Sequence, residues 1–131
     1  MVSVLFHTES HFPVNRKKIK EAIESALPSG SHDKIEVSVS VVGDRQMRRL
    51  NADFRKKDET TDVLSFPLND PTTRQAPFAD SPDGVFRLGD IVVSYPEAIE
   101  EAAQEGVLVD DKIVSLVLHG LKHLLGEHHK E

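Results

Sequence analysis

The chain contains no cysteine and no tryptophan, and it lacks any long apolar run. Without cysteine it forms no disulfide, no thiolate zinc site and no cysteine nucleophile, and this composition fits a reducing compartment. No stretch approaches the ~18 consecutive apolar residues of a membrane span. The N-terminal residues 1–6 have no basic region before them and no cleavage-like site after them, so they predict a strand rather than a signal peptide. We therefore expect a cytoplasmic protein that does not enter membranes.

The charge of the chain is unevenly distributed. The formal net charge is −6, which argues against nucleic acid as a general partner. Between residues 45 and 57, however, only Asp53 is acidic, and six residues are basic: Arg45, Arg48, Arg49, Arg55, Lys56 and Lys57. A local basic segment can bind phosphates although the whole domain is acidic. A solvated helix face is the alternative interpretation of Arg45, Arg48 and Arg49.

The spacing of apolar residues predicts a single α+β domain over residues 1–131, with one mixed sheet of about four strands and helices packed on it. Alternating or continuous apolar runs predict strands at residues 1–6, 35–41, 63–66 and 85–94, the last with a bulge at Gly89-Asp90. Helical spacing predicts four helices. The last helix is predicted at residues 112–125. The apolar residues that define the others are Ile19, Ala22, Ile23, Ala26 and Leu27 in the first, Met47, Leu50 and Phe54 in the second, and Ala98, Ile99, Ala102 and Ala103 in the third. Asp44 and Asp110 are the expected N-caps of the second and last helices.

Residues 68–84 are rich in Pro, Asp and Thr and show no period. They predict a surface loop that is long enough to act as a flap over a site.

The last predicted helix carries a pattern of metal-ligating residues. His119 and His123 are four residues apart, so they lie one turn apart on one helix face and can aim at one point. Gly126 can end the helix with a left-handed residue, after which the chain can bring a third histidine back. Three imidazoles with an open fourth position are typical of a catalytic zinc site, where a bound water becomes acidic. On spacing alone, the third ligand is either His128 or His129.

Two further segments accompany the histidines. Residues 50–67 contain Leu50-Asn51, Phe54-Arg55 and Thr61-Asp62-Val63-Leu64-Ser65-Phe66-Pro67, and the strand predicted at residues 85–94 contains Leu88-Gly89-Asp90-Ile91. In this order the three segments resemble the YbeY family of bacterial metal-dependent endoribonucleases. The family signatures are L-N-x-x-[YF]-R-x-x-x-x-T-D-V-L-S-F-P, L-G-D-I and H-G-x-L-H-L-x-G-Y-D-H. This chain departs from the last one, with Glu127-His128 in place of Tyr-Asp and Lys122 in place of Leu.

The resemblance implies a zinc-dependent endoribonuclease that cuts single-stranded RNA during ribosomal RNA maturation, above all near the 3′ end of the small-subunit RNA, and in ribosome quality control. It implies one Zn²⁺ per chain, held by His119, His123 and His129, although another divalent transition metal also suits three imidazoles. It places Arg55 as the catalytic arginine at the RNA backbone. The expected partners are single-stranded ribosomal RNA, the small ribosomal subunit and its assembly factors. We expect Arg48, Arg49, Lys56 and Lys57 to add RNA contacts.

Two other functions remain open at this point. A zinc peptidase or other metallohydrolase also uses two histidines four apart, but peptidases place a glutamate directly after the first one as general base. This chain has Gly120 there. The other alternative is a non-catalytic ribosome-binding factor in which a structural metal holds the C-terminal segment.

Overall fold

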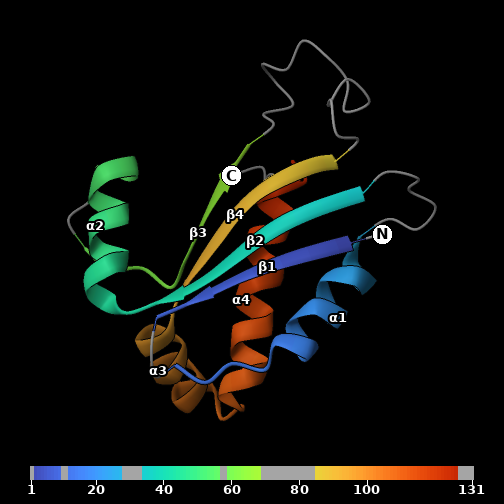
Figure 1. Cartoon of the computed structure of the whole chain (residues 1–131). Helices are drawn as coiled ribbons and strands as arrows, with labels where there is room; N and C mark the ends of the chain where they lie inside the picture. The colour runs from blue at the N-terminus through green and yellow to red at the C-terminus, as the bar shows by residue number, and fades with distance from the viewer. Residues whose placement is uncertain (1, 10–11, 28–33, 57–58, 69–84, 127–131) are drawn as a thin grey trace.

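The computed structural model describes residues 2–9, 12–27, 34–56, 59–68 and 85–126. Four strands form one mixed sheet in the order β1-β2-β4-β3: β1 (Val2–Thr8), β2 (Lys34–Val42), β3 (Val63–Pro67) and β4 (Val85–Ser94). β1, β2 and β4 run parallel, and β3 pairs antiparallel with β4 at the edge of the sheet. The predicted α+β class and mixed four-stranded sheet are therefore confirmed (Figure 1).

Four helices connect and cover the strands: α1 (Arg16–Ala26), α2 (Asp44–Arg55), α3 (Tyr95–Glu105) and α4 (Val109–Leu124). α1 and α4 pack together on one face of the sheet, while α2 lies at one end of the opposite face (Figure 1). No helix within the described part of the chain is long and apolar enough to cross a membrane.

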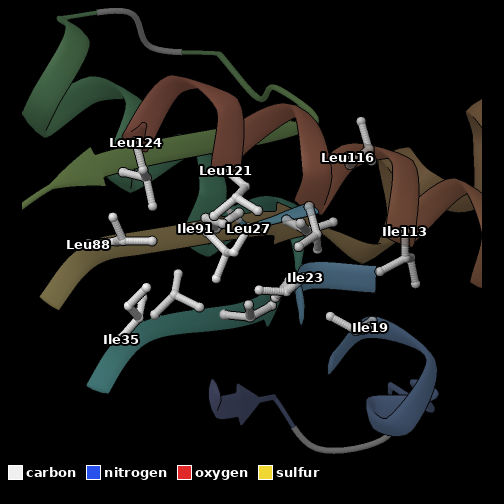
Figure 2. Close-up of a cluster of buried hydrophobic side chains, with 14 of the residues drawn as sticks. Ile19, Ile23, Leu27, Ile35, Leu88, Ile91, Ile113, Leu116, Leu121 and Leu124 are labelled. Atoms are coloured by element: carbon white, nitrogen blue, oxygen red, sulfur yellow. The ribbon is translucent and has the colours of Figure 1, made fainter. Parts of the chain in front are cut away.

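The main core lies between the sheet and the helices α1 and α4. In β2 the apolar residues alternate with polar ones, so that Ile35, Val37 and Val39 all face this core. Figure 2 shows side chains of α4, such as Leu121 and Leu124, packed over Ile91 and Leu88 of β4 and Ile35 of β2. A smaller cluster on the other face, built from Val42, Met47, Leu64 and Val92, holds α2 against the sheet.

The predicted bulge is present in β4. The pairing of β2 with β4 shifts register after Glu36, so Leu88 has no partner in β2. Gly89 follows with φ +145°, and a Cβ there would lie 2.3 Å from the carbonyl oxygen of Phe66. Only glycine therefore permits β3 to pair this closely at the bulge.

Several details of the helices differ from expectation. Gly43 and Leu108 are the N-caps of α2 and α4, and the expected caps Asp44 and Asp110 lie in the first turns, where a carboxylate favours the helix dipole. Phe54 was expected to point inward but is 64% exposed, because only one side of its ring packs, edge-on against Phe66 with the centroids 5.0 Å apart. Ile99 is also exposed, as is Ala103, because α3 buries only the stripe with Ala98 and Ala102.

The helix α4 approaches the sheet most closely at Gly120. A Cβ on this buried residue would lie 2.9 Å from Cγ2 of Ile91, which is itself fully buried. Real side-chain contacts are not that short, so any larger residue would force the helix and strand apart. The end of α4 is marked by Gly126, which has φ +84° as expected for a helix stop. The predicted flap falls mostly on residues 69–84, which lie outside the described residues.

The Gly120 contact yields a stability prediction. Gly120→Ala should lower the free energy of unfolding by about 1–3 kcal/mol, as overpacked cores do, despite the ~1 kcal/mol that alanine gains in a helix. Urea denaturation of the variant and of Gly120→Ala/Ile91→Ala measures this. The alanine penalty should shrink in the Ile91→Ala background, where the overlapping atoms are gone. Ser115→Ala, on the exposed face of α4, should be close to neutral. An equal penalty in both backgrounds would show that Ile91 is not the obstacle.

Candidate active site

A pocket of about 420 Å³ lies where the C-terminal half of α4 meets the edge strand β3 and the end of α2. Its lining residues are Arg55, Thr61, Asp62, Val63, Leu64, Ser65, His119, Gly120 and His123. The end of α2 and the start of β3 therefore meet a segment of α4 that is more than 50 residues away in the sequence. Two of the three predicted metal ligands and the predicted catalytic arginine lie together in this pocket.

The histidine pair has a geometry suited to one metal ion. His119 is exposed and His123 is half-buried, and their ring centroids lie 4.8 Å apart with the planes tilted by 58°. Two imidazoles that bind one zinc tetrahedrally at ~2.1 Å have ring centres about 5 Å apart. Among the residues that the structure describes, no group of three His, Cys, Asp or Glu side chains could hold a metal. The third expected ligand, His129, and its competitor His128 lie outside the described residues.

Arg55 reaches the pocket because it ends α2. The next residue, Lys56, adopts a left-handed conformation with φ 61°, and its backbone N–H donates to the carbonyl of Asn51. The chain leaves the helix at this point and returns toward β3, so that residues 61–65 come to lie beside Arg55 in the same pocket. The left-handed cap thus places the guanidinium at the site.

Asn51 on α2 holds the segment that leads from the end of this helix back to β3. It is 1% exposed, and its Nδ2 donates to the carbonyl of Glu59 at 2.9 Å. Its Oδ1 has no partner among the described residues. A buried amide held by a backbone carbonyl two residues before Thr61 links α2 directly to the wall of the pocket. Asn51 is thus a positioning residue for that wall.

One end of the pocket is acidic. Asp62 lies near Glu97 and Glu101 on α3, and Glu97 is also close to Asp44. Burial raises the pKa of Glu97, and the neighbouring carboxylates Asp44, Glu100 and Asp62 raise it further. Burial also raises the pKa of Glu101, while its hydrogen bond with Lys112 lowers that pKa and Asp62 raises it. Negative charge here favours a cation and disfavours a phosphate, so an anionic ligand is directed to the Arg55 side.

The other predicted basic residues lie elsewhere. Arg48 and Arg49 line a separate hollow on α2, together with Asp44, Arg45 and Ala52, and neither lines the pocket with the histidines. Lys56 is exposed directly beside Arg55, and Lys57 lies outside the described residues. A third hollow, on the α2 face of the sheet, is lined by residues such as Ser38, Ser40 and Asp90 and contains neither His119 nor His123.

The wall of the pocket was not predicted from the sequence as part of the site. Thr61, Asp62 and Ser65 line it, and Asn51 supports it, but they were noted only as parts of a motif. One signal was available, since Leu64 and Phe66 are apolar and Ser65 between them must face the opposite side of the strand. That side is the one on which α4 packs.

The buried amide of Asn51 yields a second prediction. Asn51→Asp keeps the size of the side chain but replaces the donor with a group that repels the Glu59 carbonyl. We expect it to lower the free energy of unfolding by about 1–3 kcal/mol at neutral pH and to speed hydrogen exchange at residues 59–62. Asn15→Asp is the matched control, because aspartate caps α1 as well as asparagine does. Unchanged stability and exchange in Asn51→Asp would remove its anchoring role.

Comparisons with known proteins identify the family of this chain. The family model described as Endoribonuclease YbeY matches residues 5–131. The Endoribonuclease YbeY of Persephonella marina is 35% identical over 118 residues, which are 89% of this chain and 71% of that protein. That of Halalkalibacterium halodurans is 33% identical over 133 aligned positions, which cover 98% of this chain and 82% of that protein.

The fold is also shared with a solved structure. The solution structure of TM1509 from Thermotoga maritima superimposes with a TM-score of 0.60 at 26% sequence identity, covering 99% of this chain and 75% of that one. The family match extends over nearly the whole chain and includes every segment that lines the pocket. This chain belongs to the endoribonuclease YbeY family.

Proposed function

We propose that this protein is a metal-dependent endoribonuclease that cuts single-stranded RNA during ribosomal RNA maturation, at the 3′ end of the small-subunit RNA, and in ribosome quality control. The observation that carries the proposal is the convergence of His119 and His123 from α4 with Arg55 from α2 on one pocket. Family membership supports RNA cleavage as the reaction. The small ribosomal subunit and its assembly factors are the proposed partners, and the cytoplasm is the proposed location.

The metal in this proposal is one Zn²⁺ per chain, held by His119, His123 and His129. When bound, it supplies a Lewis acid and lowers the pKa of a bound water. The described pair fits this donor set, since both rings face the same pocket at a centroid distance suited to a shared ion. Leu121 and Leu124 are buried against the sheet, so the helix that carries the histidines is fixed in position. Because the two imidazoles are already held in place, metal binding costs less conformational entropy.

Arg55 is the proposed partner of the scissile phosphate. Its guanidinium forms two parallel hydrogen bonds with phosphate oxygens, and its positive charge neutralises negative charge that develops in the transition state. The acidic end of the pocket at Asp62 keeps the phosphate on the arginine side. Arg55 is exposed and its helix ends there, so the side chain can reach a strand of RNA at the pocket mouth.

The surrounding basic residues are proposed as weaker RNA contacts. Lys56 adjoins Arg55, and Arg48 and Arg49 line the hollow further along the same helix. Arg48 and Arg49 extend positive charge along α2 away from the metal, and Lys57, which lies outside the described residues, is proposed as a further contact. Such contacts position the RNA backbone without reading its sequence, and they weaken as salt concentration rises.

The peptidase alternative is weaker in the light of the packing at Gly120. A peptidase of this type needs a glutamate at that position as general base. Gly120 is buried against Ile91, and there is no space even for a Cβ without a shift. Insertion of a carboxylate would therefore require the helix to move off the sheet. The non-catalytic alternative differs in a testable way, because it predicts RNA binding without cleavage.

Metal binding provides the third prediction. His119→Ala, His123→Ala and His129→Ala should each lose the bound metal, because each removes a direct ligand. His128→Ala and His7→Ala should retain it; His7 is an exposed histidine on β1. Metal content per chain after dialysis, measured by mass spectrometry, tests this. Loss of metal in His128→Ala with retention in His129→Ala would reverse the assignment of the third ligand.

Arg55 provides the fourth prediction. Arg55→Ala should keep the fold and the metal but cleave single-stranded RNA about 10²-fold more slowly, the usual cost of removing one preorganised charge stabiliser. Arg55→Lys should also be impaired, because a point charge does not replace the planar fork. Arg45→Ala, an exposed arginine at the other end of α2, is the control and should remain near wild type. A normal rate in Arg55→Ala would exclude this arginine from the mechanism.

A further inference from the structure

Among the described residues β3 pairs only with β4, which leaves its other edge free, and the hydrogen-bonding pattern shows which residues face that edge. The backbone N–H of Ser94 donates to Asp62 at 2.9 Å, and that of Leu68 donates to Leu88 at 3.1 Å. In an antiparallel pair such bonded residues alternate with residues whose N–H and C=O point away from the partner. Asp62, Leu64, Phe66 and Leu68 are therefore bonded to β4. The backbone groups of Val63, Ser65 and Pro67 point outward.

Pro67 fits this assignment, since proline has no N–H and is tolerated in a strand only where that group is not needed. Val63 and Ser65 thus present two N–H and two C=O groups at the free edge, spaced about 6.8 Å apart for alternate residues of a strand. Both residues line the pocket that contains His119, His123 and Arg55. The free edge is therefore a wall of the active site rather than a remote surface.

The side chain of Ser65 adds a hydroxyl to the same wall. Leu64 and Phe66 pack in the cluster on the α2 face, so Ser65 and Val63 face the side of α4. Within the described part of the chain, the Ser65 hydroxyl makes no hydrogen bond. It is half-buried at the pocket, where a polar group without a partner gains from a ligand that can bond to it.

The chemistry of this edge selects its ligand. Each outward residue offers a donor and an acceptor side by side, so a phosphate facing the edge would meet carbonyl oxygens as well as N–H groups. Arg55 is the better phosphate partner, and Asp62 disfavours an anion at the opposite end. A ribose 2′-hydroxyl both donates and accepts, and it is the group by which a protein distinguishes RNA from DNA.

We propose that the free edge of β3 at Val63 and Ser65, with the Ser65 hydroxyl, binds ribose 2′-hydroxyls of the single strand and makes the enzyme prefer RNA to DNA. The inference rests on the proposed function, which places the bound RNA strand next to Arg55 and the histidines. It assigns a specificity role to a backbone edge, whereas Arg55 and the histidines act on the phosphodiester.

Backbone amide-to-ester replacement tests the proposal with little change of shape. The α-hydroxy analogue of valine at Val63 replaces its outward N–H with oxygen, and Ser65→Ala removes the hydroxyl. Equilibrium affinities of the metal-loaded protein for an RNA oligonucleotide and for DNA of the same sequence are read by fluorescence anisotropy before measurable cleavage. Each change should weaken RNA binding about threefold to tenfold, the value of one hydrogen bond, and leave DNA binding within about twofold.

Matched controls lie at the opposite edge of the sheet. The same ester at Val4 and the substitution Ser3→Ala, both in β1, should leave the RNA-to-DNA affinity ratio unchanged. An unchanged ratio in the Val63 ester and Ser65→Ala proteins would overturn the proposal. The proposal would also be overturned if the two changes altered self-association but not the RNA-to-DNA affinity ratio. That result would mean that the edge pairs with a second copy of the chain. The proposed cleavage is tested separately, by the nuclease activity of the wild-type protein. If both changes lower the RNA-to-DNA affinity ratio but the wild-type protein does not cleave RNA, the ribose contact is upheld and the proposed cleavage is refuted.

Discussion

The close approach of α4 to the sheet at Gly120 is the constraint on which the site depends. Because Gly120 has no side chain, the helix settles against Ile91 at a distance that a Cβ would violate. Gly89 plays the corresponding role on the strand side, where a Cβ would meet the Phe66 carbonyl at 2.3 Å and a methyl of Leu124 at 3.0 Å. His119 directly precedes Gly120 and His123 lies one turn further on, so this contact sets the position of both imidazoles beside the edge strand.

The site combines parts that the two faces of the sheet supply separately. α4 carries the histidines on one face, and α2 packs on the other face but ends where Arg55 can turn toward the β3 edge. The buried amide of Asn51 holds the segment between them. The charges around the pocket are divided between its two ends, with carboxylates at the α3 end and the guanidinium of Arg55 at the other. In the proposed complex, that division places the phosphate near Arg55 and the riboses along the edge of β3.

Much of this arrangement could be predicted from periodicity, because alternation in β2 and helical spacing in α4 reflect burial directly. The histidine pair could be predicted because four residues is one helical turn. The exposure of Phe54 could not, since an amphipathic pattern does not show how much of a side chain its neighbours cover. The role of Ser65 was equally hidden, because a strand pattern does not identify which edge remains unpaired. Tertiary packing decides both, and the convergence of Arg55 with the histidines came from family resemblance rather than from spacing.

In the proposed site one metal, held by α4 histidines with an open position, acts beside Arg55 and the β3 edge. Titration of the metal-free protein with Co²⁺, followed by visible absorption, tests this most directly. Cobalt in a four-coordinate site absorbs far more intensely than cobalt in an octahedral one, and the band responds to a change of ligand. The account predicts an intense band that saturates at one equivalent per chain, shifts when single-stranded RNA is added, and coincides with the return of RNA cleavage. A weak octahedral spectrum that RNA leaves unchanged, or cleavage that is independent of metal, would contradict it.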